Sequence, residues 1–324
     1  MADVARVAGV SSATVSYVLS GKRPVAPETR AAVEAAIREL DFTVNTTARS
    51  LRTGRSSLVA LIVPDLANPF FAQLAAALEE GVRGLGLHVV VCNTGARRDE
   101  ERALLAEAVQ QRFAGVVITP FRLLPRDFQP VVDAGVPVVV SADVPFGPVD
   151  LISPDARAAT REALRCVTAA GRRRIAMIAG PRDATGGDPR LELLRTLALQ
   201  FGTSVPRDLV VRGEHTREAG AAGFGELMQR RYRPDAVFCA NDAVAVGAMD
   251  KARELGVDIP GDVALVGHDD AVFASLVRPQ LSTIRYPVGD VGRLAAQLLR
   301  ERLDGREVRK NVLVKAEFVQ RGSI

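Results

Sequence analysis

Residues 3–21 read DVARVAGVSSATVSYVLSG, and this stretch decides the architecture of the N-terminal segment. Its first six residues have a helical pattern, which Gly9-Val10 ends. Ser11 carries a side chain that caps helices, and the pattern from Ser12 to Leu19 stops at Ser20-Gly21. The stretch therefore predicts two short helices joined by a tight turn.

A third helix follows within the first 55 residues. Pro27 fits its first position, and its apolar stripe is Val33, Ile37 and Leu40. Three small helices with a tight turn between the first two form a helix-turn-helix unit. We therefore predict an all-α helix-turn-helix headpiece over residues 1–44 and a linker over residues 45–57.

From Leu58 onward, short β-branched runs alternate with longer segments of helical period. The runs, which we interpret as buried parallel strands, are Leu58–Val63, Val89–Val91, Val116–Ile118, Val138–Val140, Ile175–Ile178 and Ala236–Phe238. The helical segments have apolar residues at three- and four-residue spacing, at Phe71, Leu74, Leu78, Val82 and Leu85 and at Leu105, Ala108, Val109 and Phe113. This alternation over residues 58–324 predicts an α/β core of two doubly wound parallel-sheet lobes.

Composition narrows the class of protein. Hydrophobic residues make up 48% of the chain and charged residues 25%, and no run of about 18 apolar residues could span a bilayer, so we expect no membrane partner. The start Met1-Ala2-Asp3 is acidic where a signal peptide is basic, which predicts a cytoplasmic protein. Cys92, Cys166 and Cys239 are isolated, so we expect neither a disulfide nor a metal site, and no cofactor.

The positive charge of the chain lies mainly at its N-terminus. Residues 1–55 hold eight Lys and Arg against five Asp and Glu, which accounts for most of the net charge of +4. Any attraction to a polyanion therefore belongs to this segment. A charged, solvated helix surface would look similar, so charge alone does not establish nucleic-acid binding.

Several short motifs follow one another in a fixed order along nearly the whole chain. They are Asp3-Val4-Ala5, Ala8-Gly9-Val10-Ser11, Thr14-Val15-Ser16, Pro27-Glu28-Thr29-Arg30, Ala48-Arg49-Ser50-Leu51, Pro64-Asp65-Leu66-Ala67-Asn68-Pro69-Phe70-Phe71, Asn241-Asp242, Gly267-His268-Asp269-Asp270 and Arg278-Pro279-Gln280-Leu281-Ser282-Thr283. Together they resemble the lactose-repressor (LacI/GalR) family of bacterial transcriptional regulators. The resemblance implies a periplasmic-binding-protein-like core, with lobe one over about 58–155 and 287–314 and lobe two over about 156–286 and 315–324.

The resemblance also implies which headpiece residues meet DNA. Residues near the start of a recognition helix reach base edges in the major groove. The base-reading positions are then Ser12, Ala13 and Tyr17, and the phosphate contacts are Ser11, Thr14, Ser16 and Arg49. Family members often carry Arg where Tyr17 stands. None of the three base-reading residues can make a bidentate arginine–guanine contact, so the half-site cannot be copied from the family.

The linker from Asn45 to Leu51 is shorter than the roughly 12–15 residues that stay helical alone in water, so it should fold only on the operator. Asn45 can cap it. The resemblance implies that this hinge, with Asn45, Ala48, Arg49 and Leu51, lies in the minor groove and that Leu51 wedges between base steps. The alternative is that Leu51 is an apolar linker residue resting on the core.

The headpiece departs from the family pattern at its helix ends. Only two residues precede Asp3, so either Asp3 caps a shortened first helix or a longer natural form exists. Ala26 stands where a capping Ser is usual, a change worth about 1 kcal/mol. Asp41 and Val44 stand where Gly and Pro are common. We therefore expect reduced headpiece stability or reduced DNA affinity.

The resemblance places a small polar effector, a sugar or sugar derivative, in the cleft at the carboxyl ends of the core strands. Such a ligand needs an apolar wall and forked donors and acceptors. The matching residues are Asp65, Phe70, Phe71, Asp143, Arg190, His215, Asn241 and Asp269, with Phe70 and Phe71 as the wall and Asp269 as the anchor. Ordinary core aromatics and a salt-bridged structural Asp269 stay open as alternatives.

The three histidines bear on the ligand. His88 begins a strand, which favours a structural role. His215 stands where the family often has an aromatic pocket wall, and His268 directly precedes Asp269-Asp270. Two imidazoles in one cleft predict a ligand more polar or more acidic than a simple hexose, unless the rings act only as flat walls.

The sequence thus predicts a DNA-binding transcriptional regulator, a repressor, that binds a near-palindromic operator as a homodimer or a dimer of dimers and responds to an effector. A periplasmic-type binding protein shares the core but not the headpiece. An enzyme is disfavoured, because Gly81–Gly86 ends a helical pattern without GxGxxG spacing and no nucleophile motif accompanies His268-Asp269-Asp270. The identity of the effector, and whether it acts as inducer or corepressor, stays open.

Overall fold

The computed structural model describes residues 1–20, 23–42, 55–143, 147–182 and 187–324. The chain forms two compact units, residues 1–56 and residues 57–324. Among the described residues, no helix has the length and apolar character needed to cross a membrane.

The first unit contains three helices, α1 (Ala2–Val7), α2 (Ser12–Ser20) and α3 (Pro27–Glu39). Apolar side chains from all three meet in one core, where Val4, Val15 and Val33 are fully buried. Gly9 has φ +66°, the left-handed conformation in which glycine has no steric penalty, and it turns the chain between α1 and α2. The predicted helix-turn-helix headpiece is confirmed.

Three details at the helix ends bear on the predictions. The expectation that Asp3 caps the first helix is wrong. Helix α1 begins at Ala2 with Met1 at the N-cap position, and the Asp3 carboxylate, inside the first turn, pairs with Arg6 at 3.1 Å. Ala26 occupies the N-cap position of α3 without a side-chain hydrogen bond, as predicted. Leu40 follows the last residue of α3 and is 38% exposed, so the stripe of α3 is completed by Ala36 instead.

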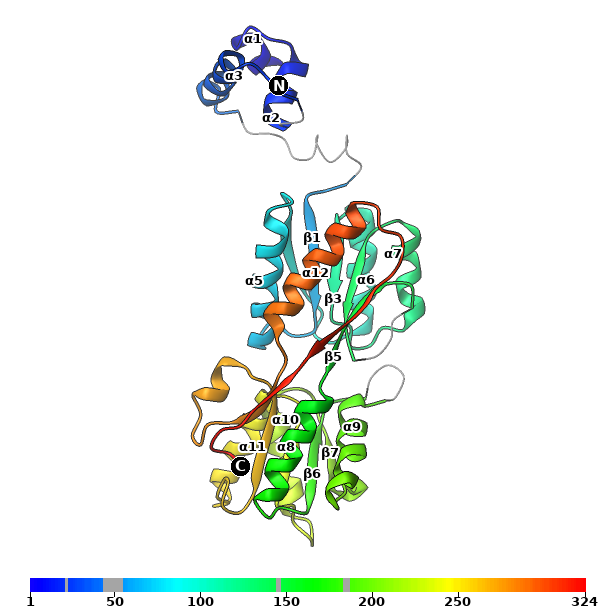
Figure 1. The fold of residues 1–324 in the computed structure, drawn as a ribbon, viewed down its shortest axis with the longest axis vertical. Helices are drawn as coiled ribbons and strands as arrows, with labels where there is room; N and C mark the ends of the chain where they lie inside the picture. The colour runs from blue at the N-terminus through cyan, green and yellow to red at the C-terminus, as the bar shows by residue number, and fades with distance from the viewer. Residues whose placement is uncertain (21–22, 43–54, 144–146, 183–186) are drawn as a thin grey trace. The chain divides into compact units, whose positions relative to one another are not determined.

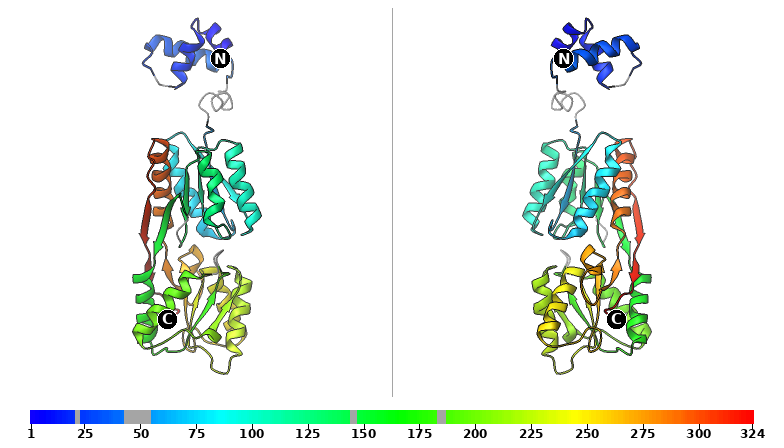
Figure 2. Two further views of the ribbon diagram at one scale, coloured as in Figure 1. Left: turned by 90° about the vertical axis from the view of Figure 1, so that its right-hand side faces the viewer. Right: turned by 90° about the vertical axis from the view of Figure 1, so that its left-hand side faces the viewer.

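Lobe one of the second unit is built on a six-stranded parallel sheet with the order β11-β5-β4-β3-β1-β2. Its strands are β1 (Leu58–Val63), β2 (His88–Asn93), β3 (Gly115–Ile118), β4 (Val138–Ser141), β5 (Asp150–Asp155) and β11 (Asn311–Lys315). Helices α5 (Pro69–Arg83) and α12 (Val288–Leu303) cover one face, and α6 (Arg98–Gln110) and α7 (Gln129–Asp133) cover the other (Figure 2). Both faces of β1 are therefore buried, which explains its unbroken apolar run.

Lobe two repeats this architecture with the order β12-β10-β9-β8-β6-β7. Its strands are β6 (Ile175–Ala179), β7 (Val210–Arg212), β8 (Ala236–Cys239), β9 (Ala264–Asp269), β10 (Ser282–Arg285) and β12 (Glu317–Val319). Its helices are α8 (Arg157–Ala169) and α9 (Pro189–Ala198) on one face and α10 (Arg217–Met228) and α11 (Asp242–Glu254) on the other. Two doubly wound lobes are confirmed, with the refinement that edge strand β12 runs antiparallel to β10.

The prediction that every β-branched run is buried is wrong for β2. Among the described strands, this one pairs with β1 alone and lies at the edge of its sheet, so one flank has no neighbouring strand there. Val90 and Val91 are 37% and 36% exposed. The run of valines predicted that β2 is a strand, but it could not indicate whether other elements cover the faces of that strand.

The chain passes between the lobes three times, from β5 to α8, from β10 to α12 and from β11 to β12 (Figure 1). We call these segments the crossovers. Tyr286 and Pro287 form the second one. Ala159, Ile284 and Ala316 pack together at the crossovers on the side of lobe two.

A buried ion network ties together three elements of lobe one. Asp150, the first residue of β5, is completely buried and pairs with Arg302 of α12 at 2.9 Å and with Arg306 at 2.7 Å. Its carboxylate also accepts a hydrogen bond from the backbone N–H of Lys310, at 2.7 Å, just before β11. The network therefore fixes the end of α12 against two strands of the sheet.

Candidate functional site

The exposed face of α2 is the candidate DNA-reading surface. The Ser11 hydroxyl accepts a hydrogen bond from the backbone N–H of Thr14 at 3.1 Å, so Ser11 caps α2 as its sequence position predicts. Val15 and Val18 of this helix are buried in the headpiece core. Ser12 and Ala13 are therefore exposed, and Ser16 and Tyr17 are half-buried.

Arg23 adds a cation to this surface. Its guanidinium lies over the ring of Tyr17, 5.2 Å from the ring centroid. Such a cation–π contact holds a flexible arginine in place. Arg23 was not among the DNA contacts predicted from the sequence, although a basic residue shortly after a recognition helix was a visible signal.

Four predicted DNA contacts, Asn45, Ala48, Arg49 and Leu51, lie outside the described residues. Their roles in the minor groove stay predictions.

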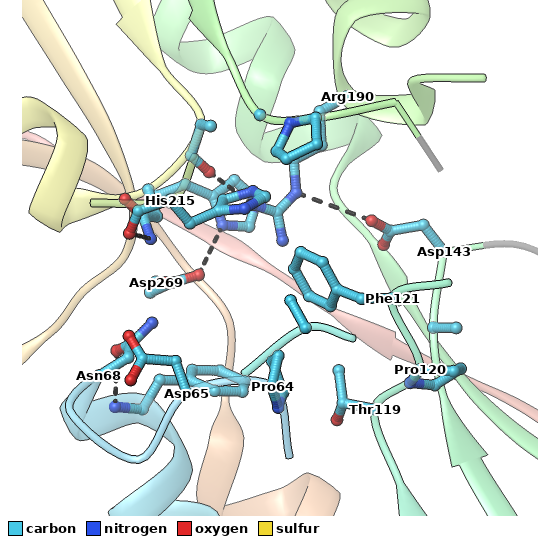
Figure 3. Close-up of a pocket in the computed structure, with 18 of the residues that line it drawn as sticks. Pro64, Asp65, Asn68, Thr119, Pro120, Phe121, Asp143, Arg190, His215 and Asp269 are labelled. Atoms are coloured by element: carbon cyan, nitrogen blue, oxygen red, sulfur yellow. Dashed lines mark hydrogen bonds and ion pairs between the residues drawn. The ribbon is translucent and has the colours of Figure 1, made fainter. Parts of the chain in front are cut away.

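In the second unit, a pocket with a cavity volume of about 750 Å³ lies between the two lobes (Figure 3). It opens at the carboxyl ends of the strands of both sheets, where Asp65, Thr119, Ala240 and Asp269 lie. Ligand sites of doubly wound proteins lie at this edge. The structure brings all eight predicted effector residues to the pocket lining: Asp65, Phe70, Phe71, Asp143, Arg190, His215, Asn241 and Asp269.

Aromatic rings form walls on both sides of the pocket. Phe70 stacks on Tyr286, with ring centroids 6.0 Å apart and an interplanar angle of 9°. Phe71 meets the edge of Phe70 but is only 6% exposed and belongs to the core of lobe one, so it is both a core residue and part of the lining. Phe121 of lobe one meets His215 of lobe two edge to face at 5.1 Å.

Arg190, in the first turn of α9, is held by partners from both lobes. Its Nη1 donates to the carbonyl of Ala240 at 2.5 Å, and its Nε lies 3.7 Å from the carboxylate of Asp143. Figure 3 shows Asp143 reaching from lobe one toward this guanidinium. Asp188 caps α9 and pairs with Arg212 at 2.8 Å, so it is not available to Arg190. Arg190 is thus a fixed donor at the pocket wall.

Asp269 ends β9 in an unusual backbone conformation. Its φ is +105° and that of Asp270 is +57°, values that non-glycine residues rarely adopt and that concentrate at functional sites. One Asp269 oxygen lies 3.1 Å from Nδ1 of His268. The double salt bridge forms instead at Asp270, which pairs with Arg285 and Arg321, each at 2.7 Å. The salt-bridged structural role suggested for Asp269 therefore belongs to its neighbour.

Both pocket histidines are neutral at physiological pH. Burial, followed by the positive charge of Arg190, lowers the pKa of His215 to about 4. Burial and Arg190 also lower the pKa of His268. His88 begins β2 and is largely exposed, 3.7 Å from Glu79, so it takes no part in the pocket. Because neutral imidazoles carry no charge to attract an anion, the predicted preference for a more acidic ligand loses its basis.

Asn241 is committed mainly to the fold. Its amide oxygen caps α11 by accepting from the backbone N–H of Val244 at 2.9 Å, and its amide N–H donates to the carbonyl of His215 at 3.3 Å. The side chain is nearly inaccessible. Asn241 therefore positions the segment that carries His215, and it has little capacity left for a ligand.

The pocket lining is acidic. Its charged side chains are five carboxylates, those of Asp65, Asp143, Asp188, Glu214 and Asp269, and two guanidinium groups, those of Arg182 and Arg190. Sequence analysis missed Thr119, Phe121, Ser141, Glu214 and Tyr286, which also line the pocket. Thr119 and Ser141 could have been found, because each comes at the carboxyl end of a predicted strand.

Comparisons with known proteins agree with this arrangement. Residues 1–45 match the family model described as bacterial regulatory proteins, lacI family, and residues 164–324 match the periplasmic binding protein-like domain. The ribose operon repressor of Escherichia coli (strain K12) is 33% identical over 310 residues, which cover 94% of this chain and 92% of that protein.

Two solved structures are similar over 99% of the chain. A complex of the transcriptional regulator CelR with cellobiose has 31% identity, 98% coverage of its chain and a TM-score of 0.75. The lac repressor dimer bound to operator and the anti-inducer ONPF has 28% identity, 97% coverage of its chain and a TM-score of 0.86.

Proposed function

Since the chain belongs to the lacI family of bacterial regulatory proteins, and is thus a DNA-binding transcriptional regulator, we propose that it is a repressor controlled by a neutral sugar or sugar derivative. The observation that carries the proposal is the pocket between the lobes. Its volume of about 750 Å³ lies within the range of small-molecule sites and has room for one or two sugar rings.

The pocket has the two features that a sugar requires. The stacked pair Phe70–Tyr286 provides a flat aromatic wall, and the edge-to-face pair Phe121–His215 adds two more rings to the lining. Arg190 and Asp269 provide a forked donor and a charged acceptor for ring hydroxyl groups. The CelR structure, similar over 99% of this chain, contains cellobiose, which supports a sugar as the effector class.

The charge of the lining favours a neutral ligand over an anionic one. Five carboxylates against two guanidinium groups make the site acidic, and Arg190 is already next to Asp143. A sugar acid or sugar phosphate would meet more carboxylates than guanidinium groups in the described lining and would therefore be repelled more than a neutral sugar. We therefore expect neutral sugars to bind in preference to their acids.

For DNA binding, we propose that Ser12, Ala13 and Tyr17 read bases and that Arg23 supplies the guanidinium that the reading positions lack. Ser11, Thr14 and Ser16 contact phosphates, and the linker residues Asn45, Ala48, Arg49 and Leu51 enter the minor groove. Two copies bind a near-palindromic operator, as in the structure of the lac repressor dimer on its operator.

Effector binding can influence DNA binding because the ligand contacts both lobes. A ligand that touches Asp65 and Phe70 of lobe one and Arg190 and Asp269 of lobe two binds both lobes at once, so its binding favours one lobe arrangement. Lobe one begins directly after the linker. A change in lobe arrangement therefore reaches the segment that leads to the headpiece.

The test combines a ligand screen with a DNA-binding assay. Thermal-shift and calorimetric measurements with cellobiose, sucrose, D-ribose and D-galactose are expected to identify at least one binder, and D-gluconate is expected to bind more weakly. Fluorescence anisotropy with DNA from upstream of the protein's own gene should then show an operator affinity that changes when this sugar is added. Tighter binding of gluconate, or operator affinity that no bound sugar alters, would contradict the proposal.

A further inference from the structure

A buried carboxyl group lies next to the pocket wall of lobe two without lining the pocket. Asp242 is the first residue of α11, and it is only 1% exposed. Its neighbour Asn241 belongs to the pocket lining, but Asp242 does not. Burying a carboxyl group is costly unless hydrogen bonds satisfy it. Asp242 can therefore influence a ligand only through the residues that it contacts.

These contacts join three elements of lobe two. The Oδ2 atom of Asp242 accepts a hydrogen bond from the backbone N–H of Ala271, just after β9, at 2.7 Å. The Oδ1 atom is hydrogen-bonded to the hydroxyl of Thr283, a fully buried residue of β10, also at 2.7 Å. Gly267 of β9 is the register partner of Thr283, and a Cβ atom at Gly267 would overlap the carboxyl group. The glycine therefore leaves room for Asp242 beside Thr283.

The contact with Ala271 closes the turn that presents Asp269. Asp269 and Asp270 both have positive φ angles, which non-glycine residues keep only where the surrounding structure holds them. Asp270 is held by its two ion pairs with arginines. Ala271, the next residue, is held by Asp242. The direction in which the Asp269 side chain leaves the backbone therefore depends on Asp242.

We propose that Asp242 is a positioning residue for effector recognition. With Thr283, it holds the turn formed by Asp269, Asp270 and Ala271 so that the Asp269 carboxylate faces the pocket (Figure 3). This inference rests on the proposed role of Asp269 as the effector anchor. The same contacts tie the turn to β10, which continues into the crossover at Tyr286.

The contacts of Asp242 do not require a charge. Burial, followed by the negative charge of Asp269, raises the pKa of Asp242 to about 8, so its side chain is mainly protonated at pH 7. A carboxylic acid can accept from the Ala271 N–H through one oxygen and donate to the Thr283 hydroxyl through the other. An asparagine amide offers the same acceptor and donor. Asp242→Asn is therefore the conservative variant, and Asp242→Ala removes both contacts.

The first measurement follows the turn without a ligand. Hydrogen–deuterium exchange of residues 269–277 is recorded by mass spectrometry in the full-length protein. Asp242→Ala should speed exchange at the start of this segment by about 3- to 10-fold, the size of one neutral hydrogen bond. Thr283→Val, which removes one partner of Asp242 and leaves the other, should have a smaller effect in the same direction. Asp242→Asn should retain the exchange rate of the unmodified protein.

Asp235→Ala is the matched control. Asp235 lies just before β8, and its mostly buried carboxylate accepts from the backbone N–H groups of Arg173 and Arg174 at 2.9 and 2.8 Å. It does not line the pocket. Asp235→Ala therefore removes a comparable set of contacts elsewhere in lobe two, and it should change neither the exchange of residues 269–277 nor sugar binding. Unfolding temperatures show whether the two alanine variants lose similar stability.

The second measurement is calorimetry with cellobiose, sucrose, D-ribose and D-galactose. For a sugar that binds the unmodified protein, Asp242→Ala should weaken affinity by about 3- to 10-fold, and Asp242→Asn should restore it. A double-mutant cycle with Asp269→Asn tests the route of the effect. Because Asp242 acts through Asp269, Asp242→Ala should weaken binding much less in the Asp269→Asn protein than in the unmodified protein.

The outcomes separate this inference from the function on which it rests. If a sugar binds the unmodified protein and Asp242→Ala equally well, or if the two substitutions in the cycle are fully additive, the positioning role is refuted and the proposed function stands. Unchanged exchange of residues 269–277 in Asp242→Ala refutes the role whether or not a sugar binds. If none of the four sugars binds the unmodified protein, the proposed function is overturned, and the role of Asp242 in sugar recognition with it. Faster exchange together with a loss of affinity that depends on Asp269 supports the inference.

Discussion

Replacing Asp150 by Asn should destabilise the core far more than a substitution at an exposed ion pair. The Asp150 carboxylate is fully buried and accepts five hydrogen bonds, two from Arg302, two from Arg306 and one from the backbone N–H of Lys310. An amide keeps the shape but loses the negative charge and turns one acceptor into a donor. The two guanidinium groups, 18% and 16% exposed, then lose their common partner.

The magnitude follows from this geometry. Breaking a buried ion pair by removing one partner costs about 3–5 kcal/mol. The lower end applies, because Arg306 also contacts Glu301 at 2.8 Å and keeps that partner. A loss of about 3 kcal/mol in the free energy of unfolding corresponds to a decrease of roughly 6–12 °C in the unfolding temperature of a core of this size.

The effect should depend on pH with a defined sign. Burial alone would raise the pKa of Asp150, but the hydrogen bonds from Arg306 and Arg302 outweigh it and hold the pKa below its ordinary value. The stabilisation is then complete above the unfolded-state pKa of about 3.9 and is lost as the pH falls through the lower folded-state pKa. The difference between the unmodified protein and Asp150→Asn should be constant from pH 5 to pH 8 and shrink below about pH 4.

Urea denaturation followed by far-ultraviolet circular dichroism measures this difference. Asp304→Asn is the matched control, because Asp304 lies 3.7 Å from Arg300 with both side chains largely exposed, and surface substitutions change stability by about 0.5 kcal/mol or less. A loss in Asp150→Asn of less than about 1 kcal/mol, or equal to the loss in Asp304→Asn, would refute the reasoning.

Three further predictions concern the headpiece and the pocket. Ala26→Ser supplies the missing cap of α3 and should stabilise the headpiece by about 1 kcal/mol, seen as slower amide hydrogen exchange in α3, and unchanged exchange would contradict it. Because burial lowers the pKa of His215 to about 4, the unfolded chain alone takes up this proton below about pH 6.5, so stability should fall between pH 6.5 and 4. His215→Gln should flatten that slope, and an unaltered slope would count against the assignment. Arg23→Ala should weaken operator binding by about 1–3 kcal/mol and relax the preference for one base of the operator, whereas Tyr17→Phe, which keeps the ring under Arg23, should retain that preference.

The elements with strong periodicity could be predicted from sequence. The run at Leu58–Val63 matches β1 residue for residue, because both of its faces are buried and its apolar pattern is unbroken. The helix around Leu74 and Leu78 is also correct, since its stripe faces the sheet. The residue pattern predicted burial wrongly at β2 and at Leu40. Their exposure is decided by the edge of the sheet and by the end of the helix, and the spacing of nearby residues indicates neither.

The pocket residues that lie in motifs could be predicted from the sequence, whereas other properties of the pocket could not. Residues such as Asp65 and Asp269 lie at motif positions, and the structure brings them together in one pocket. Tyr286 could not be found in this way, because its place in the pocket depends on a crossover that returns to lobe one about 130 residues after the chain leaves it. Nor could sequence show that both pocket histidines are neutral, since their pKa values depend on burial and on Arg190.

The three crossovers also affect how the protein is made. Lobe one contains α12 and β11, which are synthesised only after all the helices and all but one strand of lobe two. During translation the headpiece can fold as soon as it emerges, whereas the sheet of lobe one lacks β11 and the cover of α12 until the last residues leave the ribosome. Nascent and C-terminally truncated chains therefore present a folded DNA-binding headpiece on an unfinished sensor. Such fragments would carry the headpiece without a complete lobe one, and so without the complete effector pocket to which lobe one contributes.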